Sequence, residues 1–142
     1  MTTIRQLLKE MDRETLTIGP NDSVYDAIKK MADNNVGSLV VLEGDKLVGI
    51  ITERIYARNV VLKGRSSPKT TVREIMSTRV VCAWPEQSVE ECMAVMTEKS
   101  ARHLPVIENK RVIGIISIGD LVKSVIRHQK FAIEQLELYI SG

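Results

Sequence analysis

The feature that most constrains the fold is an internal duplication with a fixed offset. Gly49 and Gly114, each inside an apolar run, stand 65 positions apart. The same offset aligns Pro20 with Pro85, Ser23 with Ser88, Met31 with Met96, Leu39 with Leu104, Val41 with Val106 and Glu43 with Glu108. An ungapped offset over so many positions indicates two copies of one structural unit, and it is interpreted before any single motif.

The two copies predict the same order of elements. The first contains a helix from the capping box at residues 3–6, a strand at 15–18, a helix capped by Ser23, strands at 39–42 and 47–51, and a helix from near Glu53 through Val61. The second contains a helix from the capping box at 71–74, a strand at 80–84, a helix capped by Ser88, strands at 104–107 and 112–117, and a helix that opens at Asp120. The entry helices are offset by 68, so the first copy carries three extra residues before Pro20.

A unit with this order has a small three-stranded sheet with helices on one face only. Packing the two sheets against each other would bury both uncovered faces. We therefore expect an α/β (α+β) fold of two pseudo-twofold-related repeats with two related clefts between them. The repeats are predicted at residues 1–62 and 71–142, joined by a basic linker at 63–70. The linker contains no aromatic residue that could stack on a base, so it predicts a solvated connector.

Composition excludes several classes of function. The net charge of +2 is too small to argue for nucleic acid or membrane, and no apolar stretch is long enough to span a bilayer. The polar N-terminus lacks a signal-peptide core, and Cys82 and Cys92 form no metal-ligand spacing. We expect a cytoplasmic protein with reduced thiols and no metal. The sequence shows no nucleophile–base set or paired-carboxylate motif, so we expect no enzyme and assign no catalytic residue.

The segment from Ser117 to Asp120 is the candidate site that the residues themselves indicate. An apolar strand breaks at Ser117 and Gly119, and a helix follows, so backbone N–H groups and a positive dipole end point at one spot. Gly119 would allow an anion to approach closely, and Asp120 could accept from a ribose diol. The alternative is that Asp120 is an ordinary N-cap and Gly119 an ordinary turn residue.

The last helix differs from its counterpart because it continues to the end of the chain. Leu121, Val125, Ile133, Leu136 and Ile140 follow a roughly helical pattern. One small domain cannot cover a helix of this length, so a second copy of the chain is the simplest partner. We therefore expect a homodimer.

The sequence resembles a tandem pair of CBS domains, often called a Bateman module. The family pattern of apolar strand, Gly, two apolar residues, Ser or Thr, two residues and Asp is matched in full from Gly114 to Asp120. Residues 102–106, which read Arg-His-Leu-Pro-Val, and the entry at 71–76 match as well. More narrowly, residues 52–58 resemble small bacterial proteins made of the pair alone.

The resemblance implies a bound adenosine ligand: AMP, ADP, ATP or NAD(H), with S-adenosylmethionine ranked behind them. It implies that one cleft uses Asp120 for the ribose and Ser117 near the phosphate, together with Ile118, Gly119, Val36, Gly37 and Ser38. It implies that the other cleft uses Thr52, Arg54, Arg58, Thr71, Ala101, Arg102 and His103. Ile55 stands where this second cleft should carry the ribose carboxylate, so its basic residues would instead hold phosphates of a ligand anchored elsewhere.

Two hypotheses of different classes follow. The first is a regulatory module that senses an adenosine nucleotide and signals to an effector protein that the sequence does not name. The second is a ligand-free scaffold for dimerisation or interaction. Asp120 favours the first, whereas Ile55 and the long last helix favour the second. Arg54, Arg58 and Arg102 also have a simpler interpretation as solvated or helix-end cations.

Overall fold

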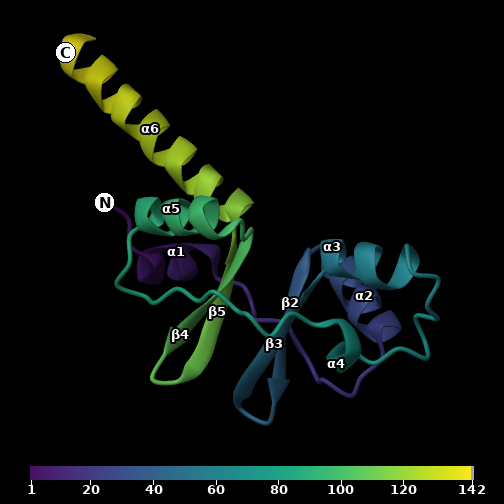
Figure 1. Ribbon diagram of the computed structural model, residues 1–142. Helices are drawn as coiled ribbons and strands as arrows, with labels where there is room; N and C mark the ends of the chain where they lie inside the picture. The colour runs from purple at the N-terminus through teal and green to yellow at the C-terminus, as the bar shows by residue number, and fades with distance from the viewer. Residues whose placement is uncertain (142) are drawn as a thin grey trace.

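The computed structural model describes residues 1–141 and contains two small sheets surrounded by helices (Figure 1). The first repeat contains α1 (Ile4–Met11), β1 (Thr17–Ile18), α2 (Val24–Asp33), β2 (Ser38–Glu43), β3 (Lys46–Thr52), α3 (Glu53–Tyr56) and a π-helical turn, η1 (Ala57–Val61). The second contains α4 (Val72–Ile75), α5 (Val89–Lys99), β4 (His103–Glu108), β5 (Arg111–Ser117) and α6 (Ile118–Ser141). The predicted mixed helix-and-strand fold of two small packed sheets is confirmed.

The two hairpins have the same register. In β2 and β3, Val41 pairs with Gly49, and in β4 and β5, Val106 pairs with Gly114, with a register irregularity just after each pair. These pairs are related by the offset of 65. The duplication in the sequence is therefore a duplication of strand pairing.

The sheets differ in their third strand. β1 runs parallel to β2, whereas the predicted strand at residues 80–84 is reduced to a single bridge between Ala83 and Val106. In the first sheet the Val40 N–H donates to Leu16. Pro105 takes the place of Val40 and has no N–H, so the same bond cannot form. The prediction of a full strand there was wrong for this reason.

Each repeat completes its core with the entry helix of the other. Ile4 and Leu7 of α1 are buried with Val89, Leu104 and other residues of the second repeat, and α4 packs into the first core. Figure 1 shows α1 beneath α5, and α4 on the side of α2 and α3. The first copy has three extra residues in this region, and its entry helix is longer: α1 has eight residues, whereas α4 has four.

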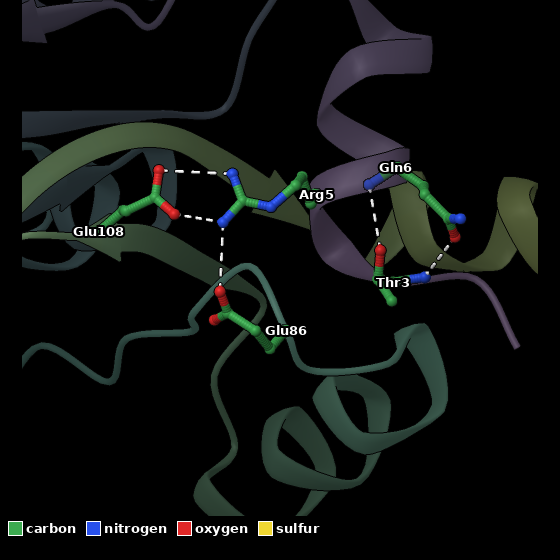
Figure 2. Close-up of polar contacts among 5 residues, drawn as sticks. All are labelled: Thr3, Arg5, Gln6, Glu86 and Glu108. Atoms are coloured by element: carbon green, nitrogen blue, oxygen red, sulfur yellow. Dashed lines mark hydrogen bonds and ion pairs between the residues drawn. The ribbon is translucent and has the colours of Figure 1, made fainter.

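The exchange of entry helices is held by equivalent polar contacts. Arg5 of α1 pairs with Glu108 of the β4 strand and, at 3.1 Å, with Glu86, while the Thr3–Gln6 capping box closes the start of the helix (Figure 2). In the other half, Arg73 of α4 pairs with Glu43 of β2. All of these pairs are exposed, so they orient the helices while the buried apolar residues supply most of the stability.

Candidate functional site

Two clefts lie between the repeats, where the carboxyl ends of β3 and β5 lead into α3 and α6. The smaller, here called the Asp120 cleft, has a volume of about 240 Å³ and is lined by residues that include Asp120, Ser117 and Val36. The larger, here called the basic cleft, has a volume of about 500 Å³ and is lined by residues that include Thr52, Ile55 and Arg102. Each cleft thus joins one strand–helix turn to a loop of the other repeat.

The start of α6 differs from the prediction that Asp120 is its first, capping residue. The helix begins at Ile118, and the hydroxyl of Ser117 accepts from the Asp120 N–H at 3.2 Å. The Asp120 carboxylate in turn accepts from the Ser117 N–H at 2.8 Å. Ser117 is therefore the N-cap and Asp120 stands at the third helical position, a reciprocal capping arrangement that fixes the carboxylate at the edge of the cleft.

Arg13 holds the same carboxylate and was missed by sequence reasoning. Its two terminal nitrogens donate to Oδ1 of Asp120 at 3.1 Å and to Oδ2 at 2.6 Å. Arg13 lies in the connection between α1 and β1, where the sequence gives no motif. Only the exchange of α1 into the second repeat brings it to Asp120.

These contacts set the charge state of Asp120. Burial by itself would raise the pKa of the carboxyl, but the hydrogen bonds from Arg13 and from the Ser117 backbone outweigh it and hold the pKa below its ordinary value. At neutral pH the group is a carboxylate. It can accept hydrogen bonds from hydroxyl groups and cannot donate to them.

Three residues of the first repeat face Asp120 across the cleft. Val36, Gly37 and Ser38 all line it, as the resemblance implied for a ligand site. Ile118 and Gly119 belong to the same turn but are not among the lining residues. The structure therefore brings together five of the seven residues expected in this cleft.

The basic cleft collects cations from both repeats. Thr52, Arg54, Ala101, Arg102 and His103 line it as expected. Arg58 and Thr71 do not line it; Thr71 instead forms a bridge with Ser23 at the start of α4. The lining also includes two cations that sequence reasoning missed, Arg79 and Lys99. Their only signal in the sequence was their place near the predicted strand at 80–84 and at the end of the second-repeat helix.

His103 and Gly37 line both clefts and mark where they meet. A Cβ added to Gly37 would lie 3.2 Å from Glu53 Oε1 and 3.5 Å from His103 Nε2, so the absence of a side chain leaves this junction open. Burial lowers the pKa of His103, and the nearby Asp120 and Glu53 only partly oppose this. His103 is therefore mainly neutral at pH 7.

Among residues 1–141, no group of three or more His, Cys, Asp or Glu side chains is placed to hold a metal ion. In the same part of the chain, no helix is long and apolar enough to cross a bilayer.

Comparison with known proteins gives the family. The model of the CBS domain matches residues 4–60 and again residues 72–127. The chain belongs to the CBS-domain family. It is a tandem CBS pair, and pairs of this family are regulatory modules.

Relatives extend over nearly all of the chain. The Arabidopsis thaliana protein named CBS domain-containing protein CBSX3, mitochondrial, is 41% identical over 99% of this chain and 73% of its own length. A solved structure from Burkholderia ambifaria MC40-6, described as a signal-transduction protein with CBS domains, is 54% identical, with a TM-score of 0.85 over 90% of this chain and 96% of its own.

One of the similar solved structures contains adenosine-based ligands. The CBS domain pair of protein MJ0100, in complex with 5′-methylthioadenosine and S-adenosyl-L-methionine, is 26% identical, with a TM-score of 0.77 over 88% of this chain and 96% of its own. Both of these ligands contain adenosine.

Proposed function

We propose that this chain is a sensor that binds an adenosine nucleotide with its ribose at Asp120 and its phosphates in the basic cleft. The observation that carries the proposal is the fixed, ionised Asp120 carboxylate at a cleft that opens past His103 into a second cleft rich in cations. AMP, ADP, ATP and NAD(H) all share the required ribose and phosphate chemistry. S-adenosylmethionine ranks behind them because it has no phosphate for the basic cleft.

The hydrogen bonds that Asp120 already accepts determine which of its contacts a bound ribose must replace. A carboxylate oxygen has two lone pairs. Oδ2 already accepts from Arg13 and from the Ser117 N–H, and Oδ1 accepts from Arg13. Two ribose hydroxyls can both donate to the carboxylate only if Arg13 releases at least one of its bonds. The Arg13 side chain is 44% exposed and can turn toward solvent, whereas Asp120 is only 12% exposed, so the ribose hydroxyls must replace the bond that the carboxylate loses.

The basic cleft provides the counter-charge for phosphate. Its lining carries the four cations Arg54, Arg79, Lys99 and Arg102 and the single carboxylate of Glu53. Several cations around a concave surface attract an anion more strongly than separate surface pairs do. Phosphates that extend from a ribose at Asp120 would pass His103 and Gly37 to reach them.

The direct test is a thermal-shift and calorimetry panel of adenosine, AMP, ADP, ATP, NAD, NADH and S-adenosylmethionine. A ligand at about a hundred times its dissociation constant should stabilise the protein by roughly 2.7 kcal/mol. The proposal expects phosphorylated ligands to bind more tightly than adenosine, and Arg102→Ala to remove most of that difference while leaving adenosine affinity unchanged. Absence of binding by every ligand in the panel would leave the scaffold hypothesis in place.

We propose that the sensor is a homodimer and that its output passes to a separate effector protein. The motivation for self-association is the row of exposed apolar residues on α6, which include Ile133, Leu136 and Ile140. We also propose a cytoplasmic location, because both cysteines are free thiols. Light scattering at micromolar concentration tests the first point, and cell fractionation tests the second.

A further inference from the structure

The last helix extends well beyond the domain that carries it. α6 has 24 residues, which corresponds to about 36 Å. Leu121 and Ser124 are buried against the second repeat, but every residue from Ile126 to Ile140 is exposed. Figure 1 shows this part of α6 projecting past α5, away from both sheets. Within the described part of the chain, this segment has only polar contacts at its start, from Arg127 to Glu10 and from His128 to Thr2, and its apolar residues are left uncovered.

One face of the exposed helix has the spacing of a coiled coil. Its apolar positions alternate between steps of four and three residues, interrupted by a single polar residue. The positions are Val122, Ile126, Gln129, Ile133, Leu136 and Ile140. Ile occupies every position of one kind, and Val, Gln and Leu occupy the positions of the other kind, which is the two-position repeat of a coiled-coil seam. Ile126, Ile133 and Leu136 are each more than half exposed, so this face, here called the seam, is free to pair.

The charges beside the seam select a direction for the pairing. On one flank, the first half carries Lys123, Arg127 and Lys130, and the second half carries Glu134 and Glu137. On the other flank, the positions directly beside the seam carry no charge and are occupied by Val125, Ala132 and Tyr139. In a parallel pair, the charged flank of one helix would face the apolar flank of the other.

In an antiparallel pair, like flanks meet, so the basic half of one helix lies beside the acidic half of its partner. Lys123 then lies opposite Glu137 of the second copy, twice in each dimer, and Lys130 lies opposite Lys130 of the second copy once, so attractive contacts outnumber the repulsive one. The same alignment places Ile126 opposite Leu136 and Val122 opposite Ile140, so four of the six layers are fully apolar. The two central layers pair Gln129 with Ile133. Antiparallel helix dipoles add to this preference.

We infer that the seam of α6 docks on the seam of a second copy of this chain as an antiparallel helix pair. The inference deepens the homodimer proposed above by naming its surface and its direction, and it does not depend on nucleotide binding.

The surface is tested with two matched substitutions. Ile133→Glu puts a charge into the seam, whereas Leu138→Glu makes the same change at a residue that is equally exposed but lies off the seam. Sedimentation equilibrium should show that Ile133→Glu raises the dissociation constant of the dimer at least about tenfold, while Leu138→Glu changes it less than twofold. Far-UV circular dichroism of both variants checks that the helix is retained.

The possible outcomes distinguish the proposal of a homodimer from the proposal that the seam is its surface. A wild-type protein that is monomeric at micromolar concentration would reject both the homodimer and the seam. A wild-type dimer that Ile133→Glu leaves intact, or that both variants weaken equally, would keep the homodimer and reject the seam as its surface.

The direction is tested by exchanging charges. Lys123→Glu and Glu137→Lys each place like charges opposite one another twice in an antiparallel dimer, so each should weaken self-association several-fold. Mixing the two variants should produce a heterodimer as tight as the wild type, because both contacts then join opposite charges. A mixture no tighter than its separate components would overturn the antiparallel arrangement. Association, not nucleotide binding, is measured because Lys123 also lines the Asp120 cleft.

Discussion

The two strand–helix turns of this protein share their backbone geometry and differ in the side chain at the third helical position. The hydroxyl of Thr52 accepts from the Ile55 N–H at 3.1 Å, and the hydroxyl of Ser117 accepts from the Asp120 N–H at 3.2 Å. In one turn the third residue is an ionised carboxylate at a cleft, and in the other it is an apolar side chain packed partly on the first core.

The clefts at the two turns also differ in the charges that line them. The Asp120 cleft contains Arg13 and Lys123 against Glu14 and Asp120, whereas the basic cleft contains four cations and one carboxylate. The duplicated scaffold therefore presents a carboxylate at one turn and an excess of cations at the other, as the proposed ribose and phosphate positions require. The comparison teaches that the capping geometry can be kept while the charge of the cleft at each copy changes.

The largest effect is expected from Asp120→Asn. Two charge-assisted hydrogen bonds to the ribose are each worth roughly 1.5–3 kcal/mol, so adenosine-nucleotide affinity should fall at least about tenfold. The Asn side-chain oxygen can still accept from the Ser117 N–H, so the variant should keep most of its melting temperature without ligand and lose only what the Arg13 ion pair contributes. Calorimetry that shows equal affinities for wild type and variant would remove Asp120 from the site.

The converse change, Ile55→Asp, should give the basic cleft the acceptor that it lacks. A second adenosine site, with affinity raised at least about tenfold over the parent cleft, is expected from the same two hydrogen bonds. Some stability should be lost because Ile55 packs partly on the core of the first repeat. Titration with adenosine that still gives one site per chain would show that the two turns differ in more than this residue.

Substitutions at the equivalent glycines Gly49 and Gly114 compare how tightly the two exchanged entry segments pack on the sheets. A Cβ on Gly49 would lie 2.9 Å from the Ser77 backbone oxygen, whereas one on Gly114 would meet only the side chain of Leu8, at 2.7 Å. A side chain can shift more easily than a backbone. Gly49→Ala should therefore cost about 1–3 kcal/mol of unfolding free energy, and Gly114→Ala should cost less. Urea denaturation of both variants measures the difference.

The smallest effect is expected in the pH dependence of stability, and it arises from His103 at the junction of the clefts. Because burial lowers the pKa of His103 in the folded protein, the unfolded chain binds more protons, and stability is lost as the pH falls below about 6.5. Asp120, whose pKa is lowered from an acidic value, adds a loss only at more acidic pH. His103→Gln should flatten the first step in a series of thermal melts and leave the second. An unchanged profile would show that His103 does not titrate in this range.

Local patterns in the sequence predicted most of the elements and half of the site. The offset of 65 predicted both hairpins, and the capping boxes at Thr3 and Thr71 predicted the starts of α1 and α4. Ser117 and Asp120 were assigned to the cleft because a strand–turn–helix unit is local and its backbone geometry follows from few residues. The same reasoning placed the wrong residue at the cap, because either residue can bond to the other's N–H.

What only the tertiary structure decided is the set of contacts between segments that are distant in the chain. Arg13 reaches Asp120 because α1 packs into the second repeat, and Arg79 and Lys99 converge because the two repeats face each other. No local periodicity or helix cap predicts these contacts, because they depend on how the uncovered faces of the two sheets pack against each other. The sequence by itself determined the repeated unit and its turns, because those bonds are local; the exchange of entry helices determined which charges the turns face.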